Sequence, residues 1–243
     1  MASPATMTDM PPVAAVILAA GKGTRMKSAL HKVLHPLAGR PMLLHLLEAV
    51  EGLQPARTVI VVGAGRGQVE AAVGMRATVV VQDPQLGTGH AVQQAEAALT
   101  GFDGVVLILY GDVPLVETVT MARMIAALSD DVAAVVLGFR PAESGAYGRI
   151  VATGGRIDKM VEFKDASDAE RAVTLCNSGL MAVRASDLWP LLARVGNANA
   201  AGEYYLPDIV GLADRPSAVI DTGATEVTGV NSRAELAGLE ATW

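Results

Sequence analysis

The sequence predicts an α/β protein built on a doubly wound, mostly parallel sheet. Short runs rich in Val, Ile and Leu alternate along the first half of the chain with segments whose apolar residues recur at helical spacing. Hydrophobic residues make up 51% of the 243 residues but aromatic residues only 4%, so aliphatic side chains must fill the core. Both features are typical of parallel strands covered by helices, and the length suffices for one domain with a sizeable core.

In the first half, turn and capping residues separate the expected strands from the expected helices. Pro41 suits the first position of a helix, where no N–H is needed, and Leu43, Leu47 and Val50 would then share one stripe. Thr88 has a side chain that can cap a helix. The expected elements are strand 13–18, helix 41–52, strand 58–62, helix 67–73, strand 77–81, helix 88–99, strand 105–109, helix 117–128 and strand 132–137.

The second half is richer in strands, and we interpret it as a smaller β-rich lid on the same core. Two glycines at 154–155 mark a turn between longer apolar runs. No composition shift or linker requires a second domain. The expected elements are strands 149–152, 156–163 and 174–183, helices 186–195 and 207–212, short strands 218–221 and 226–230, and a last helix from about Ser232.

Charge and cysteine content narrow the functional class. The net charge is −6, with no basic tail, which disfavours broad binding to nucleic acid. No apolar run reaches transmembrane length, and residues 1–12 lack the features of a secretory signal, so we expect them to be a disordered extension. Cys176 is the single cysteine; we expect a small buried residue in a cytoplasmic protein rather than a nucleophile.

The stretch 16–32 has the features of a site for nucleotide phosphates. A buried strand ends at Ala19-Ala20-Gly21, where small residues let the backbone approach a ligand. The spacing of the glycines fits neither a Walker A loop nor a dinucleotide fingerprint, and a solvated loop is the simpler alternative. Against it stand cations that would attract a polyphosphate at the carboxyl end of a first strand: Lys22, Arg25, Lys27 and Lys32.

Asp112 and Asn231 are candidate ligands for a metal ion. Asp112 directly follows the expected strand 105–109 and its Tyr110-Gly111 turn, and Asn231 follows the expected strand 226–230. A carboxylate and an amide oxygen, completed by phosphate oxygens and water, form the shell that Mg²⁺ prefers. A turn or capping role for Asp112 stays open on the residues alone. The four histidines are scattered and, with one cysteine, form no zinc pattern.

A series of further motifs completes the pattern. The opening L-A-A-G-x-G-T-R-M is followed by K-V-L-x-x-L-x-G-x-P-M, and the later motifs are Gln82, G-T-G-H at 87–90, Y-G-D at 110–112, Y-G-R-I at 147–150, E-F-K-D-A at 162–166, N-S-G at 177–179, G-E-Y-Y at 202–205 and G-V-N at 229–231. In order and spacing the chain resembles the sugar nucleotidyltransferases. Within them it is most similar to the uridylyltransferase half of bifunctional bacterial N-acetylglucosamine-1-phosphate enzymes.

The resemblance implies a Rossmann-like nucleotidyltransferase fold that makes UDP-N-acetylglucosamine and pyrophosphate from UTP and N-acetylglucosamine-1-phosphate. It implies Arg25, Lys32 and Asp112 as catalytic residues, with Mg²⁺ held by Asp112 and Asn231. Gln82 would read the uracil, because an amide offers both a donor and an acceptor to a base edge. The residues implied at the nucleotide are Leu18, Ala19, Ala20, Gly21, Lys32, Gln82, Gly87, Thr88, Tyr110, Gly111 and Asp112.

The same resemblance implies an acceptor site formed by Gly148, Glu162 and Asn177. Gly148 would offer a backbone N–H to the sugar, and Glu162 would accept hydrogen bonds from its hydroxyl groups. Asn177 lies in an apolar run, where its side chain needs a partner. The pair Tyr204-Tyr205 either belongs to this side of the site or packs on the core.

Two residues depart from the family pattern, and the family's second half is missing. His31 replaces a Pro of the phosphate loop, and Pro207 replaces a Thr near the acceptor. We expect residues 13–231 to form the nucleotidyltransferase domain and 232–243 to begin a linker helix, without the trimerising acetyltransferase β-helix, and hence a monomer with no nucleic-acid or membrane partner. The alternatives are an enzyme for another sugar-1-phosphate or dTTP, a non-catalytic sugar-nucleotide-binding regulatory subunit, and, less well supported, a dehydrogenase.

Overall fold

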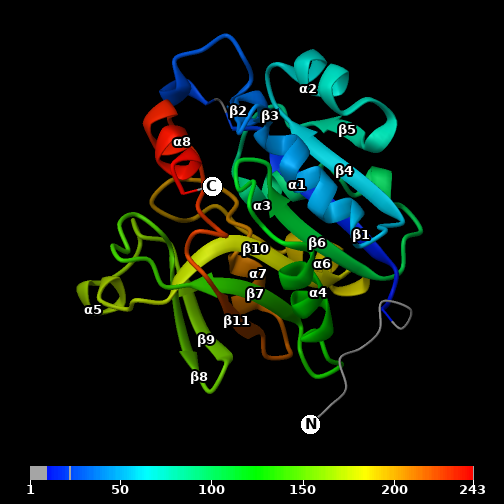
Figure 1. Cartoon of the computed structure of the whole chain (residues 1–243). Helices are drawn as coiled ribbons and strands as arrows, with labels where there is room; N and C mark the ends of the chain where they lie inside the picture. The colour runs from blue at the N-terminus through cyan, green and yellow to red at the C-terminus, as the bar shows by residue number, and fades with distance from the viewer. Residues whose placement is uncertain (1–9, 22, 243) are drawn as a thin grey trace.

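A nine-stranded mixed sheet organises the molecule (Figure 1). The structure is a computed structural model that describes residues 10–21 and 23–242. The strand order is β5-β4-β1-β6-β10-β7-β11-β9-β8. The strands are β1 (Val13–Ala19), β4 (Arg57–Val62), β5 (Thr78–Val81), β6 (Val105–Tyr110), β7 (Ala134–Phe139), β8 (Arg149–Thr153), β9 (Arg156–Val161), β10 (Cys176–Arg184) and β11 (Ala218–Thr222), with a separate hairpin of β2 (Pro36–Leu37) and β3 (Arg40–Pro41).

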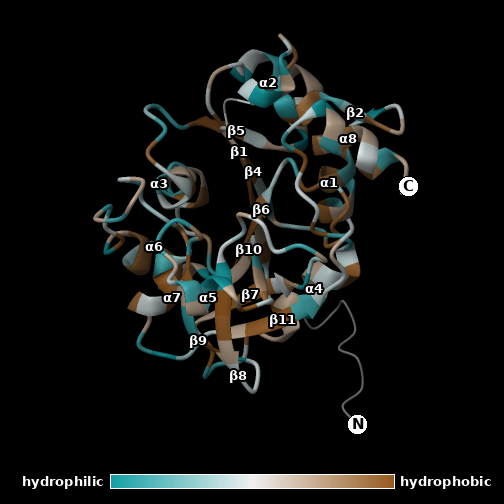
Figure 2. Cartoon of the chain, turned by 90° about the vertical axis from the view of Figure 1, so that its left-hand side faces the viewer, coloured by the Kyte–Doolittle hydropathy of each residue, from teal (hydrophilic) through white to brown (hydrophobic). Residues whose placement is uncertain are grey.

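Helices cover both faces of the sheet, as the strand–helix alternation predicts (Figure 2). Side chains alternate along β1, so that Ala15 and Ile17 join one core layer while Val16 and Leu18 join the other. The first layer packs against α1 (Met42–Glu51), α2 (Arg66–Val73) and α4 (Thr118–Ala126), and the second against α3 (Thr88–Gln93), α6 (Ala185–Leu192) and α7 (Asp208–Leu212). The predicted doubly wound α/β class is confirmed.

Strand β10, in the middle of the sheet, runs in the direction opposite to that of its neighbours β6 and β7. It lies antiparallel between β6 and β7, while β1 is parallel to β4 and β6, and β11 is parallel to β7. The hairpin β8–β9 then pairs with β11 through Ala218 and Arg156, and with β10 through Cys176 and Arg149. The β-rich second half is therefore a closed ring of strands at one side of the same sheet.

Most expected element boundaries lie within a few residues of the observed ones, but three expectations differ more from the structure. The expected strand 226–230 is wrong: the segment forms a turn and a loop. The bonds that hold it include one from Val230 N–H to the Asp112 carbonyl (2.9 Å) and one from the Thr222 hydroxyl of β11 to the Glu226 carboxylate. The expected helix 88–99 ends at Gln93 and is followed by the 3₁₀ turn η5 (Ala97–Leu99). Helix α5 (Asp168–Arg171) was not predicted, although the Ser167 and Glu170 capping box that begins it is a readable signal.

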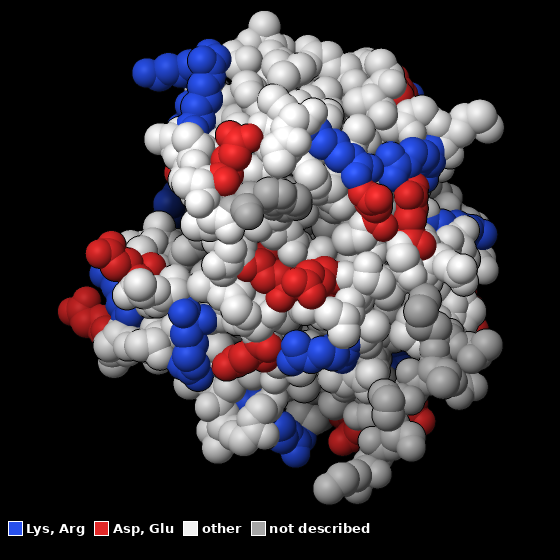
Figure 3. Space-filling model, in the orientation of Figure 1, with Lys and Arg blue, Asp and Glu red and all other residues white. Residues whose placement is uncertain are grey.

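The surface charges and the chain ends give little information about where the functional site lies. On the face drawn in Figure 3, acidic and basic side chains lie interspersed, and ion pairs such as Arg76–Glu51 (2.7 Å) occur among them. Cys176 is buried and free, as predicted. In the described part of the chain, no helix has the length and apolarity needed to cross a membrane. Most of the expected N-terminal extension, residues 1–9, lies outside the described residues.

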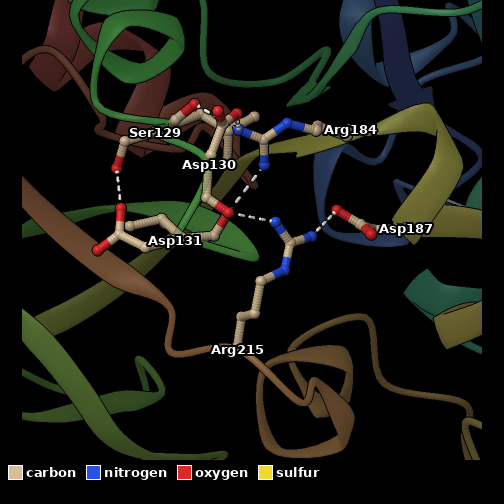
Figure 4. A network of polar contacts seen from close by, with 8 residues as sticks. Ser129, Asp130, Asp131, Arg184, Asp187 and Arg215 are labelled. Carbon is tan, nitrogen blue, oxygen red and sulfur yellow. Dashed lines mark hydrogen bonds and ion pairs between the residues drawn. The ribbon is translucent and has the colours of Figure 1, made fainter.

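Two arginines form hydrogen bonds and ion pairs at the amino ends of the parallel strands (Figure 4). Arg184, at the end of β10, donates to the carbonyls of Val132 and Leu128 (both 2.9 Å). Arg215 pairs with Asp187 and donates to the Asp130 carbonyl (2.6 Å). These contacts stabilise the end of the sheet opposite to the carboxyl ends, where the candidate site lies.

Candidate active site

A cavity of about 440 Å³ opens at the carboxyl ends of β1 and β6. Ligands of open α/β sheets bind at this edge. Ten of the residues predicted from the sequence line it: Leu18, Ala19, Ala20, Gly21, Lys32, Gln82, Gly87, Thr88, Tyr110 and Asp112. The other lining residues, which the sequence reasoning missed, are Val33, Gln85, Ala91 and Glu203.

Lys32, Asp112 and Asn231 form one polar cluster at the cavity. The Lys32 ammonium is ion-paired with Asp112 and donates a hydrogen bond to Asn231 Oδ1 (2.8 Å). The bond from Val230 N–H to the Asp112 carbonyl places Asn231 there without any strand before it. The side chains of Lys32 and Asp112 are only 11% and 19% exposed, so little water screens their interaction.

The two predicted metal ligands fit Mg²⁺ because they would supply two oxygens of a coordination shell that phosphate oxygens and water complete. Asp112 and Asn231 point a carboxylate oxygen and an amide oxygen at the same cationic atom, Lys32 Nζ. No group of three or more His, Cys, Asp or Glu residues suited to a metal occurs among residues 10–21 and 23–242. The site therefore suits an ion that keeps water and phosphate oxygens in its shell, as Mg²⁺ does.

Arg25 lies apart from this cluster. It belongs to the 3₁₀ turn η2 (Thr24–Met26), is exposed, and makes no hydrogen bond or ion pair with any described residue. It does not line the cavity. Lys22, another of the cations predicted in this loop, lies outside the described residues.

The Gln82 side chain is fixed beside the loop that follows β5. Its amide nitrogen donates to the Gly87 carbonyl (2.8 Å) and lies 3.1 Å from His90 Nδ1. With both amide hydrogens directed to the protein, the carbonyl oxygen is left as the acceptor for a ligand. Gly87 has φ of +111°, and a Cβ there would lie 2.6 Å from the Tyr204 carbonyl, so only glycine fits this loop.

Tyr110 stands between the cavity and the second half of the sheet. Burial raises the pKa of its phenol above the ordinary range, and the charges of Glu162 and Asp112 add to this, while a hydrogen bond with Thr88 acts in the opposite sense. A Cβ on Gly179 would lie 2.6 Å from Tyr110 Cε2. The phenol is thus neutral at ordinary pH, and its ring packs directly on β10. Gly111 contributes its backbone, since its N–H donates to the Leu18 carbonyl (2.9 Å).

Gly148, Glu162 and Asn177 are brought together, as their predicted shared role requires, although they do not line the cavity at β1 and β6. Asn177 N–H donates to the Gly148 carbonyl (2.9 Å), and a Cβ on Gly148 would lie 3.3 Å from Glu162 Oε2. The Asn177 side chain has a partner in the Gly179 N–H (2.8 Å). Burial raises the pKa of Glu162, with smaller contributions from Asp208, Asp165 and Glu203.

Comparison with known proteins assigns the family. Residues 15–199 match the family described as MobA-like NTP transferase domain. The chain belongs to this family. The predicted nucleotidyltransferase membership is therefore confirmed.

Two curated relatives are each called bifunctional protein GlmU. That of Novosphingobium aromaticivorans is 63% identical over 238 residues, which are 96% of this chain and 53% of the relative. That of Rhizorhabdus wittichii is 64% identical over 244 residues, 98% of this chain and 54% of the relative. The chain spans about half the length of the curated relatives it matches.

A solved structure confirms the fold of this NTP transferase. It is a UDP-glucose pyrophosphorylase complexed with UDP-glucose, which superposes with a TM-score of 0.75 over 95% of this chain and 98% of the other. At 17% sequence identity the similarity concerns the fold alone.

A strap formed by residues 199–206 crosses the NTP transferase site. Tyr204 exchanges backbone hydrogen bonds with Leu86 and Gly89 (both 2.8 Å), and Leu206 N–H donates to Thr88 Oγ1 (3.0 Å). The Thr88 hydroxyl is thus not the helix cap that the sequence suggested, and α3 begins without a side-chain cap. At its other end the strap reaches the acceptor side, where Ala200 N–H donates to Asp165 (3.0 Å).

His31 does not disturb the placement of Lys32 in this NTP transferase. Its backbone N–H donates to Gln68 Oε1 (2.8 Å), and Gln68 Nε2 donates to the Ala29 carbonyl (3.0 Å), so α2 holds the loop. The imidazole is buried, and neither ring nitrogen has a hydrogen-bond partner among the described residues. Burial, and next the charge of Lys32, lower the pKa of His31.

Proposed function

We propose that this domain transfers a uridylyl group from UTP to N-acetylglucosamine-1-phosphate and releases pyrophosphate. The observation that carries the proposal is the position of Tyr110. It lines the cavity that holds Gln82, and its ring packs on Gly179, whose N–H donates to the Asn177 side chain (2.8 Å). This position supports a reaction centre between the cavity and the group of Gly148, Glu162 and Asn177. The bifunctional relatives, 63% and 64% identical to this chain, support the choice of substrates.

The proposed reaction is an in-line displacement at the α-phosphorus of UTP. An oxygen of the sugar phosphate forms the new P–O bond, and the bond to the pyrophosphate oxygen breaks. The attacking phosphate is already an anion at neutral pH, so no general base is needed. Catalysis then consists of positioning and charge neutralisation. The Lys32 ammonium supplies the cationic charge at the cavity, and Arg25 must turn inward from its exposed turn to join it.

Asp112 and Asn231 would hold Mg²⁺, which when bound neutralises negative charge on phosphate oxygens. The Lys32 ammonium contacts both of these oxygens, so the two side chains are directed at one point. We also propose that the domain comprises residues 13–231 followed by the linker helix in 232–243, acts in the cytoplasm as a monomer, and takes small-molecule substrates. Gel filtration with light scattering tests the monomer, and a dimer or trimer mass would contradict it.

Pyrophosphate release from a substrate panel tests the proposed function. UTP with N-acetylglucosamine-1-phosphate and Mg²⁺ should exceed dTTP or glucose-1-phosphate in kcat/KM. Asp112→Asn should lower kcat/KM by about 100-fold. Asp103→Asn, an exposed aspartate just before β6 at the opposite end of that strand, is the matched control and should leave it unchanged. Near-wild-type turnover of Asp112→Asn would remove the metal assignment, and preference for another pair of substrates would overturn the function.

A further inference from the structure

Arg149 is a fully buried cation at the start of β8. Its residue is 2% exposed. The guanidinium donates to the carbonyls of Gly145 (3.2 Å), Arg171 (3.3 Å) and Ser144 (3.4 Å), and also to that of Tyr147. Three of these four carbonyls belong to the turn 144–147, which precedes Gly148. Three hydrogen bonds from one arginine thus hold a single short turn in place.

No carboxylate of the described residues pairs with this charge. Arg149 takes part in none of the ion pairs among those residues. Besides the carbonyls, its neighbour is the Phe163 ring, whose centroid lies 5.6 Å from the guanidinium carbon. Burying a charge without a counter-ion costs free energy that a hydrophobic residue would not. An arginine at this position is explained by the hydrogen bonds that it donates to the turn 144–147, because they fix the shape of that turn.

The turn decides how Gly148 faces the acceptor group. The Gly148 carbonyl accepts from Asn177 N–H (2.9 Å), and a Cβ on Gly148 would come within 3.3 Å of Glu162 Oε2. The residue is buried, yet its own N–H donates to no described residue. A buried N–H needs a partner, and a bound ligand beside Glu162 would supply one. The geometry of residues 144–147 fixes where this N–H points.

We propose that Arg149 is a positioning residue for the acceptor sugar. Through its carbonyl contacts it holds the turn 144–147 so that the Gly148 N–H and the Glu162 carboxylate face the sugar together. Among the described residues, its side-chain hydrogen bonds and ring contact involve none of those that line the cavity, so its effect should fall on the sugar phosphate and not on UTP. This inference rests on the proposed function, because it concerns the acceptor of that reaction.

Steady-state kinetics with Arg149→Lys and Arg149→Met test the inference. Lysine keeps the charge but cannot reach four carbonyls at once. Both variants should raise the KM for N-acetylglucosamine-1-phosphate at least about 10-fold while the KM for UTP stays within about twofold. Calorimetric titration gives a second readout: UDP should bind as in the wild type, and UDP-N-acetylglucosamine should lose its advantage over UDP.

Arg184→Lys and Arg184→Met are the matched controls. Arg184 also donates to buried carbonyls, those of Val132 and Leu128, but at the amino end of the sheet (Figure 4). Both control variants should leave the two KM values unchanged. Equal changes in the KM for UTP and for the sugar phosphate in Arg149→Lys, or no change in either, would overturn the inference. If the wild type turns over a different sugar phosphate, the proposed function fails, and the same comparison made with that acceptor still decides the role of Arg149.

Discussion

His31 buries two polar atoms that make no hydrogen bond with any described residue. A buried, unpaired polar group costs about 1–3 kcal/mol, and both nitrogens of the His31 ring are in this condition. Its backbone N–H to Gln68 does not depend on the side chain. We therefore predict that His31→Leu raises the free energy of unfolding by about 1 kcal/mol, as measured by urea denaturation at pH 7.5. His45→Leu, which removes the ring contact with the Leu37 carbonyl (2.8 Å), is the control and should destabilise.

The His31 ring also makes stability depend on pH. Its pKa in the folded protein lies below the ordinary value of 6.5, because of burial and Lys32. As the pH falls through 6.5, the unfolded chain takes up a proton that the folded chain does not, so folding is disfavoured. Wild-type stability should thus fall more steeply below pH 6.5 than that of His31→Leu. Parallel stability curves for the two proteins between pH 7.5 and 5.5 would contradict this.

Glu162 is held in a site that is unfavourable for its charge. Burial raises its pKa, and Asp208, Asp165 and Glu203 raise it further, so the carboxylate destabilises the fold at neutral pH. We predict that Glu162→Gln unfolds at a higher temperature but raises the KM of the sugar phosphate about 10-fold, because an amide accepts hydroxyl donors less strongly than a carboxylate. A melting scan and kinetics check the two effects. Glu143→Gln, an exposed control, should show neither.

Among single residues, the sequence could identify those that belong to motifs. Gln82 and Gly87 were predicted, and the structure shows a hydrogen bond between them. Gln85 and Glu203 were missed although they line the cavity. Gln85 reaches the Ala20 carbonyl across 65 residues, and Glu203 arrives with the strap. The contact of Gln85 leaves no periodicity or spacing in the sequence. Glu203 stands in the G-E-Y-Y motif at 202–205, in which a role was predicted only for the two tyrosines.

At the scale of elements, helix α8 (Arg233–Glu240) contacts the chain on both sides of Lys32. Arg233 donates to the Lys27 carbonyl (2.9 Å), and Glu240 accepts from Ala38 N–H (2.9 Å). Glu235 accepts from Asn231 N–H (2.6 Å). A helix expected only as the start of a linker thus supports both the loop that leads to Lys32 and the residue that Lys32 contacts.

Glu235 offers the sharpest test of this support. We predict that Glu235→Ala lowers stability by about 1 kcal/mol, the value of one hydrogen bond, and lowers kcat about 10-fold by loosening Asn231. Glu235→Gln keeps an acceptor oxygen for the Asn231 N–H and should retain most activity. If the alanine variant matches the wild type in kcat, α8 does not position the metal ligand.

Elements were predictable where local signals suffice. The core strands β1 and β6 are continuous apolar runs, and their buried positions follow from that alone. Residues 226–230 have the composition of a strand, but bonds such as that from Val230 N–H to the Asp112 carbonyl replace a ladder. Whether a short apolar run forms a paired strand or an unpaired loop depends on neighbours far away in the sequence. No local pattern could therefore decide between strand and loop.

At the scale of the whole molecule, the closed ring of strands could not be predicted from the sequence. It requires β10 to run antiparallel between β6 and β7 and then to meet β8 through Cys176 and Arg149. These pairings join segments distant in sequence, and periodicity carries no information on strand order. The ring places Gly148, Glu162 and Asn177 on the same sheet as the cavity, so that in the proposed function one product molecule would contact both.

This arrangement predicts a specific pattern of ligand stabilisation. In the proposed function, UDP would contact the cavity alone, whereas UDP-N-acetylglucosamine would also reach Gly148 and Glu162, and tethering the two parts would make the second contact intramolecular. At equal concentration the sugar nucleotide should therefore raise the melting temperature more than UDP does, because tighter binding to the native state shifts unfolding further. Differential scanning fluorimetry measures both shifts.

Gly148→Ala should abolish the difference between the two ligands. Its Cβ would crowd Glu162 Oε2 at 3.3 Å, and it would occupy the space beside the N–H that the sugar needs. The shift with UDP should remain. Gly211→Ala is the matched control, since a Cβ there meets no atom within 4 Å, and it should keep both shifts. Because the wild type and Gly211→Ala share an intact ring, equal shifts with the two ligands in either protein would show that the sugar binds elsewhere than at the ring.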